Sequence, residues 1–443
     1  MAQQRDDLET VTAPIPVLHR RPRWRDTFDS LRVHNYRLYV MAQLISNTSA
    51  WMMRIATDWL VFELTGSVAL VGLTVALQFA PMLLFGVFGG VIVDRCSKRH
   101  LLLGTQSASA VLCAVLALLA ILEVAQLWQV YAIAFSLGCV AVLDSPARSV
   151  FVNEMVGHER LGNAISINAS IFHLGGLLGP AVSGILIAVV GAGWSIGVNA
   201  VAAAIVVATL SSMRTAELLP TRAVRRARGQ IREAIGYARS KPTIFWPLVM
   251  LGFVAAFGMS LPVLLVAFAD HVYGTGASGY GLYSSVAAIG ALSGAIGSAR
   301  RTTVRLRSII AAAGAFGLAL VFTGAAPGQW LFLVFLTSIG FARLLFATGA
   351  ESIVQLSSNR GIRGRIMALY SMVVLGGQSV GGPAMGWIAE SWGANAAMVI
   401  AGAVPAVAAA VIAAVLARSG RLSLRFAIRR RSPFLSIVPR GSL

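Results

Sequence analysis

The chain has 443 residues, of which 57% are hydrophobic and only 12% are charged, with 44 glycines and a formal net charge of +19. This composition excludes an ordinary soluble domain, in which about a quarter of the residues are charged. In a soluble chain such a positive charge would favour a nucleic-acid partner, but here the arginines fall where they would meet anionic lipid headgroups, so we expect no nucleic-acid binding.

The positive charges are grouped along the chain. All but two of the 36 Lys and Arg residues, the exceptions being Arg54 and Arg343, lie in basic stretches that alternate with apolar segments. The intervening loops, near Glu63, Gly193 and Glu390 among others, carry none. The positive-inside bias places the basic stretches in the cytoplasm. We therefore expect a multi-pass protein of the plasma (inner) membrane with both termini cytoplasmic.

The apolar segments are long enough to span a bilayer, which takes about 20 residues of helix. Twelve crossings bring both ends of the chain to the same side, as the charges require. We expect them at 38–62, 67–93, 101–122, 127–148, 163–190, 194–213, 244–269, 279–299, 308–325, 329–351, 366–390 and 395–417.

The longest basic connection divides these crossings six and six. The expected fold class is all-α integral membrane, with twelve transmembrane helices in two six-helix pseudo-symmetric halves. The expected parts are a cytoplasmic N-terminal segment 1–37 with an amphipathic helix around Trp24, Phe28 and Leu31, a first half 38–213, a basic linker 214–243 lying along the membrane surface, a second half 244–417, and a basic tail 418–443.

The two halves repeat a glycine-rich motif at the same place. Helix five carries LGGLLGPAVSG at Leu174–Gly184, and helix eleven carries LGGQSVGGPAMG at Leu375–Gly386. This argues for a duplicated six-helix unit. In each motif a Gly-Pro pair removes a backbone donor and allows close helix contact. The first motif contains Gly175, Gly179, Pro180 and Gly184.

The loop after the second helix carries a family signature. Gly90, Asp94, Arg95, Lys98 and Arg99 resemble the loop motif of the major facilitator superfamily, with Ser97 where that family usually has glycine. The resemblance implies the major facilitator fold.

In that family the aspartate of the motif lies near the start of helix eleven, and its second basic group pairs with an acid at the inner end of helix four, which braces the outward-facing state. These roles would fall to Asp94, Lys98 and Asp144. The matching loop of the second half, Arg300 to Arg307, has no aspartate, so the brace would be one-sided.

Further stretches narrow the resemblance. The motif at Gly175–Gly184 is similar to the Gly-Pro signature of antiporters in this superfamily. The stretches Trp51–Ser67 and Asp144–Glu154, the latter containing Arg148, resemble the branch of siderophore exporters and macrolide-efflux proteins. Helix four lacks the mid-membrane arginine that many drug and proton antiporters carry, so the usual proton route is not evident.

Two charged residues lie where lipid would be expected. A charge at a helix centre costs at least about 2.5 kcal/mol in the bilayer, so it normally faces a cavity or a partner. Arg54 and Asp58 share one face of helix one with Gln43, Asn47 and Trp51. We expect this face to line a polar pathway.

Asp58 is a candidate proton carrier. An ion pair with Arg54, one turn away, would hold it ionised, whereas desolvation would favour its protonated form. A purely structural ion pair is the alternative. Arg343 of helix ten would add a charge to the same cavity, either as an anchor for an acidic group or as a packing residue.

No motif in the sequence indicates an enzyme. There is no phosphate-binding loop, no metal-ligand spacing and no nucleophile paired with a base, so we expect no cofactor and no metal. The preferred interpretation is a monomeric, proton-coupled secondary exporter of small, partly apolar molecules such as drugs or siderophores. Substrate-proton uptake and a non-transport scaffold or sensor are the alternatives, and the sequence does not identify the substrate.

Overall fold

The computed structural model describes residues 29–219, 230–299, 305–359, 362–418, 423–426 and 435–438. Nearly all of these residues are helical. The helices are α2 (His34–Thr65), α3 (Val68–Arg95), α4 (Lys98–Ile121), α5 (Leu127–Val190), α6 (Ala192–Ser212), η2 (Thr215–Glu217), α7 (Gln230–Ser240), α8 (Pro242–Phe253), η3 (Val254–Gly258), α9 (Leu261–Ala267), η4 (Phe268–Val272), α10 (Gly276–Ala299), α11 (Leu306–Gly324), α12 (Gln329–Ser357), α13 (Arg363–Trp392) and α14 (Ala394–Arg418).

Each of the twelve segments expected to cross the membrane is helical. Helix α5 contains two of them, within Leu127–Gly157 and Arg160–Val190. The two spans are separated at Gly157, whose φ of 70° and ψ of 176° are not helical. The run from α8 to η4 forms a further unit, Pro242–Val272, which includes the π-helical turns η3 and η4.

Ten helices of the described chain are long and apolar enough to cross a membrane. Helices α2 and α13 are not among the ten, although they have 32 and 30 residues and therefore ample length. Both are less apolar than the others: α2 carries Arg54 and Asp58, and α13 carries Glu390 and several glycines.

The short turn between α2 and α3 shows how the sequence sets the helix ends. Gly66 adopts the left-handed conformation, with a φ of 65°, and stops α2. Ser67 then caps α3, because its hydroxyl accepts a hydrogen bond from the Leu70 amide at 3.3 Å. The two helices must therefore run antiparallel.

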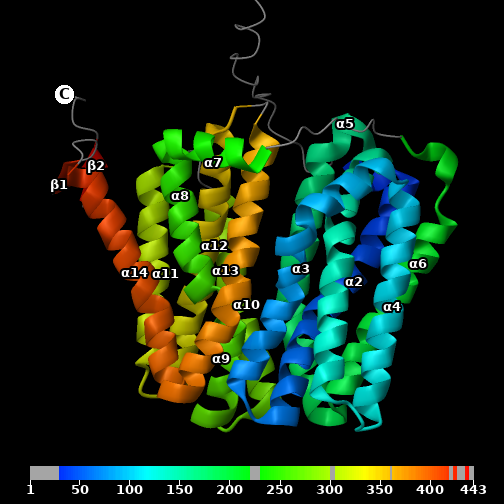
Figure 1. Ribbon diagram of the computed structural model, residues 1–443, viewed down its shortest axis with the longest axis horizontal. Coiled ribbons are helices and arrows are strands. Elements are labelled where there is room, and N and C mark those ends of the chain that lie inside the picture. The colour runs from blue at the N-terminus through cyan, green and yellow to red at the C-terminus, as the bar shows by residue number, and fades with distance from the viewer. Residues whose placement is uncertain are drawn as a thin grey trace, which may run out of the picture.

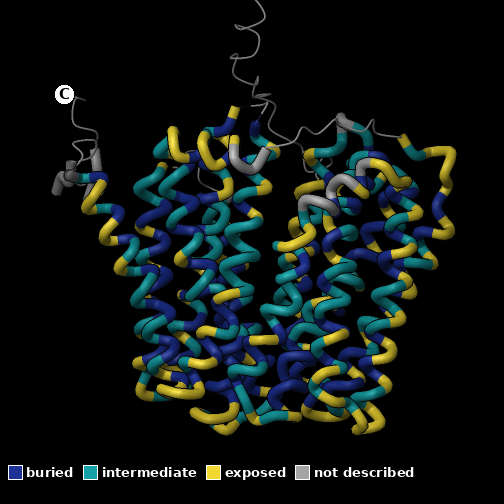
Figure 2. Tube along the Cα trace, in the orientation of Figure 1, coloured by how far each residue is buried: buried dark blue, intermediate teal, exposed yellow. Residues whose placement is uncertain are grey.

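The helices form two groups that stand side by side (Figure 1). The N-terminal group comprises α2 to α6, and the C-terminal group comprises α8 to α14. The ribbons of the two groups approach each other at the lower end in this view and diverge towards the end where α7 lies. In Figure 2 many buried residues lie in the lower region where the groups meet.

Close contacts join the two groups in what we call the junction. Gly184 of α5 lies against Gly281 of α10, where a Cβ on Gly184 would come within 2.7 Å of the Gly281 Cα atom. Gly72 of α3 lies against Gly382 of α13 in the same way. The Glu390 carboxylate accepts hydrogen bonds from the Ser67 hydroxyl at 2.7 Å and from the Ala69 amide at 3.1 Å.

The segments outside the two groups differ in part from expectation. The amphipathic stretch of the linker is α7, which is tied to the C-terminal group by an ion pair between Glu233 and Arg365. The helix expected around Trp24 and Phe28 lies outside the described residues. In the tail, where the sequence indicates no strand, β1 (Ser423–Phe426) pairs antiparallel with β2 (Leu435–Val438), with Ser423 opposite Val438.

Candidate functional site

A cavity of about 380 Å³ lies inside the N-terminal group. Helices α2 to α6 supply all of its lining residues except Leu375, which comes from α13. Its volume is within the range of small-molecule sites. Its polar lining includes Arg54, Thr57, Gln106, Asp144, Arg148 and Asn199.

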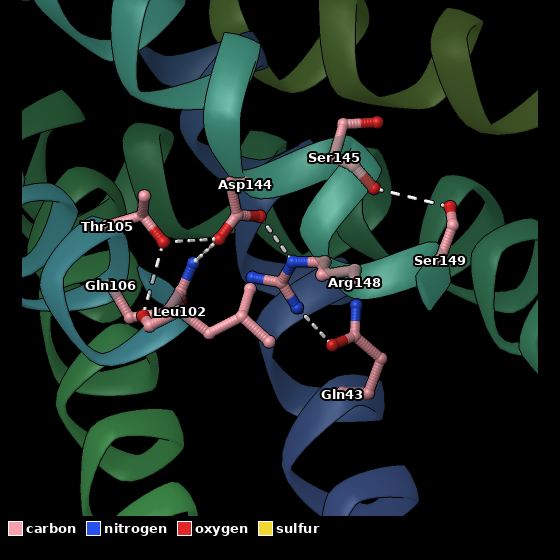
Figure 3. A network of polar contacts seen from close by, with 8 residues as sticks. All are labelled: Gln43, Leu102, Thr105, Gln106, Asp144, Ser145, Arg148 and Ser149. Atoms are coloured by element: carbon pink, nitrogen blue, oxygen red, sulfur yellow. Dashed lines mark hydrogen bonds and ion pairs between the residues drawn. The ribbon is translucent and has the colours of Figure 1, made fainter. Parts of the chain in front are cut away.

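A network of polar side chains (Figure 3) borders this cavity through Gln106, Asp144 and Arg148. Asp144 and Arg148, one turn apart on α5, form an ion pair. The other Asp144 oxygen accepts hydrogen bonds from Thr105 Oγ1 at 2.8 Å and Gln106 Nε2 at 2.7 Å. Arg148 also donates to Gln43 Oε1 on α2. Both carboxylate oxygens of Asp144 are therefore occupied by donors.

The partner of Asp144 differs from the one that the family resemblance implied. Asp144 pairs with Arg148, not with Lys98. The Lys98 side chain is buried, and its ammonium donates locally to the Cys96 carbonyl at 3.1 Å.

Two further residues of the loop motif, Arg95 and Arg99, do not line the cavity. Arg99 donates to the carbonyls of Leu210 and Ser211 at the end of α6, at 2.8 and 3.0 Å. Arg95 is exposed. The surroundings of Gly90 and Asp94 lie outside the described part of the structure.

Arg54 is held by aromatic rings. Its guanidinium carbon lies 5.0 Å from the centroid of the Trp51 ring and 5.3 Å from that of Phe79, both within cation–π range. Among the described residues it has no hydrogen bond or ion pair, so the direct pair expected with Asp58 is not formed. The two charges interact electrostatically over a longer distance.

Asp58 lies at the junction between the groups and has no exposed surface. Its Oδ2 atom accepts a hydrogen bond from the hydroxyl of Tyr280 on α10 at 2.9 Å. Its Oδ1 atom is buried without a hydrogen-bond partner in the described chain. The Trp59 ring stacks on Tyr280, with centroids 6.4 Å apart. A buried carboxylate thus connects α2 of one group to α10 of the other.

The face of α2 that lines the cavity is not the face that the sequence pattern indicated. The cavity is lined by Ser46, Ala50, Met53, Arg54 and Thr57. Apart from Arg54, each of these residues precedes a residue of the expected row by one position, which corresponds to a rotation of roughly 100° about the helix axis. Of the expected row only Arg54 reaches the cavity.

Helix α5 covers part of the expected row. The Asn47 backbone lies against Gly175, and Trp51 packs against Gly179. The first Gly-Pro motif therefore takes part in two helix contacts. Gly175 and Gly179 allow α2 to pack closely, and Gly184 allows α10 to do so. The Pro180 carbonyl also lies at the α10 contact, beside Gly281.

Arg343 stands apart from this cavity. It is partly buried on α12 and does not line the cavity of the N-terminal group. In the described chain it has no ion pair, although it interacts electrostatically with His173 of α5.

Several residues of the site were not found from the sequence, namely Thr57, Phe79, Thr105, Gln106 and Tyr280. Tyr280 lies 222 positions from Asp58, and nothing local marks it as a partner. Thr57 is 1% exposed, lines the cavity and has a hydroxyl oxygen with no partner among the described residues. A search for polar residues on every face of helix one would have found Thr57.

Comparison with known proteins identifies the family of this chain. A family model described as transmembrane secretion effector (MFS_3) matches residues 25–424. The enterobactin exporters EntS of Shigella boydii serotype 4 and of Citrobacter koseri are each 25% identical, over 82% and 83% of this chain and 87% and 88% of theirs.

Solved structures share the fold at low sequence identity. The nucleoside transporter NupG superposes with a TM-score of 0.68 at 12% identity, covering 86% of this chain and 99% of that one. A bacterial homologue of the human lysosomal transporter Spinster also gives 0.68, at 15% identity, with 86% and 95% covered. At these identities the likeness establishes the fold alone.

Proposed function

This chain belongs to the transmembrane secretion effector family of major facilitator transporters, and we propose that it exports small, partly apolar molecules in exchange for protons by alternating access. That it is a multi-pass membrane transporter and not an enzyme follows from the family. The direction, the coupling ion and the class of substrate are our proposal.

The proposed architecture has twelve crossings in two six-helix halves. Helices α2 and α13 are the two additional spans, since both run alongside helices that are apolar enough to cross. The repeated contacts support a duplication. Helix α5 packs on α2 and α10, and α13 packs on η3 and α3.

The basic stretches set the proposed orientation. They place the linker and both termini in the cytoplasm, and the junction then lies on the outer side. The structure would accordingly be an inward-facing state, with its outer gate closed. Opening requires the groups to rock apart at the junction, as in other transporters built from repeats.

Asp58 is the proposed proton carrier, and its place in the junction is the observation that carries this proposal. Burial opposes its charged form, whereas Tyr280 and Arg54 favour that form. Separation of the groups would expose Asp58 to the outside, where it can take up a proton. Return to the inward-facing state would bring the carboxyl back to Tyr280 and Arg54, which favour its charged form and thereby loss of the proton.

The loop motif is the proposed gate on the other side. When the outer junction opens, the cytoplasmic ends of the groups must close, and Asp94 then meets the start of α13. Lys98 and Arg99 would hold the loop against the N-terminal group, as Arg99 does at the end of α6.

The test is flux in inverted membrane vesicles. A panel of dyes, drugs and siderophores should include compounds that accumulate in the vesicles when the lumen is acidified. Asp58→Asn should abolish the acceleration by the proton gradient, whereas Asp270→Asn, which changes an exposed acid, should keep it. Full gradient-driven transport by Asp58→Asn would exclude Asp58 as the carrier. Flux in the opposite direction would favour uptake.

A further inference from the structure

The cavity of the N-terminal group has a charge pattern that selects its ligand. Among the described residues its charged lining consists of Arg54, Asp144 and Arg148. Asp144 and Arg148 compensate each other, and the Asp144 oxygens are fully occupied. A cationic ligand would therefore find no free carboxylate in the described lining of this cavity.

Two groups of the lining that have no hydrogen-bond partner in the described chain, on Arg54 and Thr57, can donate to a ligand. The Arg54 guanidinium can only donate, and its position between Trp51 and Phe79 fixes it without using its N–H groups. The Thr57 hydroxyl lines the same cavity, 1% exposed and without a partner in the described chain. A ligand with acceptor oxygens can accept hydrogen bonds from both.

The rest of the lining is apolar and adaptable. Met53, Met82, Leu116 and Leu137 contribute to the wall, and Phe79 adds an aromatic face. Methionine side chains adapt to irregular shapes. An apolar or aromatic body therefore fits beside the two donors.

We propose that this cavity binds an uncharged molecule that has an apolar body and carbonyl or ether oxygens, held by Arg54 and Thr57. We further propose that the Asp58 carboxylate makes this binding possible by compensating the charge of Arg54. The proposal rests on the proton coupling proposed above, and it names the substrate class of that cycle.

The coupling between proton binding and ligand binding follows from the free-energy cost of removing water from the Arg54 guanidinium. When Asp58 is ionised, Arg54 and Asp58 together carry no net charge, and an uncharged ligand can displace water from the guanidinium. When Asp58 is protonated, the charge of Arg54 is uncompensated. Displacing water from it then costs more, because an unpaired charge is poorly tolerated away from water. Proton and substrate would thus exclude each other although they occupy different atoms.

The groups near Asp58 agree with this interpretation. The charged and titratable side chains that act on it are Arg54 of α2 and Tyr280 of α10. In the described lining of the cavity the further charges are the Asp144–Arg148 pair. An anionic ligand would behave in the opposite way, because a proton on Asp58 would strengthen its attraction to Arg54.

The test measures binding in detergent with three related fluorescent probes. These are 7-diethylaminocoumarin, which is an uncharged lactone, its 3-carboxylate, and a derivative with a trimethylammonium group. The wild-type protein should bind the lactone at pH 8, and the cationic derivative at least tenfold more weakly. Tighter binding of the cationic derivative than of the lactone would overturn the proposed class.

Variants then isolate the role of charge. Asp58→Asn should weaken lactone binding about tenfold and strengthen carboxylate binding. In an Arg54→Gln background, which lacks the charge to be compensated, Asp58→Asn should change lactone binding by less than about threefold, and the control Asp270→Asn should bind like the wild type. Thr57→Val should weaken lactone binding while leaving its dependence on Asp58 unchanged.

The outcomes separate this proposal from the proposed function. If Asp58→Asn leaves lactone binding unchanged, or weakens it as strongly in the Arg54→Gln background while the protein remains folded by thermal melting, charge compensation is wrong. If the binding pattern holds but reconstituted vesicles show no proton-driven flux, proton-coupled export fails and the ligand assignment stands.

Discussion

At the scale of single residues, the hydrogen bond from Tyr280 most directly affects the protonation of Asp58. Tyr280→Phe removes the donor and leaves both carboxylate oxygens without a partner in the described chain. A lost donor to a buried charge costs about 1–3 kcal/mol. The charged form is the one weakened, so we expect Asp58 to lose its proton only at higher pH.

The pH profile of transport is the measurement for this prediction. In reconstituted vesicles the half-maximal point should move to higher pH in Tyr280→Phe. Tyr283→Phe is the matched control, because Tyr283 lies on the same helix but contacts Thr275 and Gln329 instead. Profiles that coincide for both variants would mean that Tyr280 does not act on the coupling group.

The Asp144–Arg148 pair gives a second prediction for single residues. Asp144→Asn leaves Arg148 with an uncompensated, largely buried charge, and we expect a loss of stability of up to about 3 kcal/mol. Replacing both residues, Asp144→Leu with Arg148→Met, should recover most of it. Thermal melting in detergent measures the difference. A double variant as unstable as the single one would show that the pair also organises Gln43 and Gln106.

At the scale of elements, the bend in α5 depends on one glycine. Gly157 combines a positive φ with an extended ψ, a region that is essentially closed to other residues. Gly157→Ala should therefore destabilise the protein by about 1–3 kcal/mol. Gly162→Ala should be neutral or stabilising, because Gly162 is helical and has open space around its Cα atom. Thermal melting should show a lower melting temperature for Gly157→Ala but not for Gly162→Ala. Equal changes in melting temperature for the two variants would contradict backbone strain at position 157.

The helices themselves could be predicted from the sequence, whereas their contacts could not. Long apolar runs and basic loops are local signals, and they located all twelve segments. The bend at Gly157 was missed because the charged stretch around Arg160 was interpreted as a loop between helices. The rotation of α2 was missed because a polar row with helical spacing also fits packing against the small residues Gly175 and Gly179.

Long-range pairs have no trace in a single sequence. The Tyr280 hydroxyl reaches Asp58 only because Gly184 and Gly281 let α5 and α10 approach closely. The bond from Arg148 to Gln43 of α2 is also long-range, whereas the ion pair of Arg148 with Asp144 joins residues one turn apart on α5. The candidate site was therefore found in part: Arg54, Asp58, Asp144 and Arg148 were named, but the Tyr280 partner of Asp58 and the Thr105 and Gln106 partners of Asp144 were not.

At the scale of the whole molecule, alternating access requires the junction to open. Glu390 of α13 accepts bonds from Ser67 and Ala69 at the start of α3, which ties the two groups together. Replacing Ser67 and Glu390 by cysteine, in a chain without Cys96, Cys113 and Cys139, allows a short, reducible bifunctional thiol reagent to join them. We expect the cross-link to stop transport and a reductant to restore it.

Each single cysteine, treated with the same reagent, is the control for this experiment and should retain transport. Continued transport by the cross-linked double variant would show that the junction does not open during the cycle. Transport that is lost equally in the single variants would instead point to the Glu390 bonds themselves.

The cavity belongs almost entirely to one of the two groups, and this has a consequence for the cycle. A ligand held by α2 to α6 would move together with the N-terminal group, because its contacts with Arg54 and Thr57 are kept when the groups rock apart. The rocking step then breaks few ligand contacts, and the intrinsic affinity should be nearly equal from the two sides of the membrane. Release to the outside must in that case be caused by the change in charge at Asp58. The proton would then serve to lower the affinity for the ligand, and not to drive the rocking of the two groups.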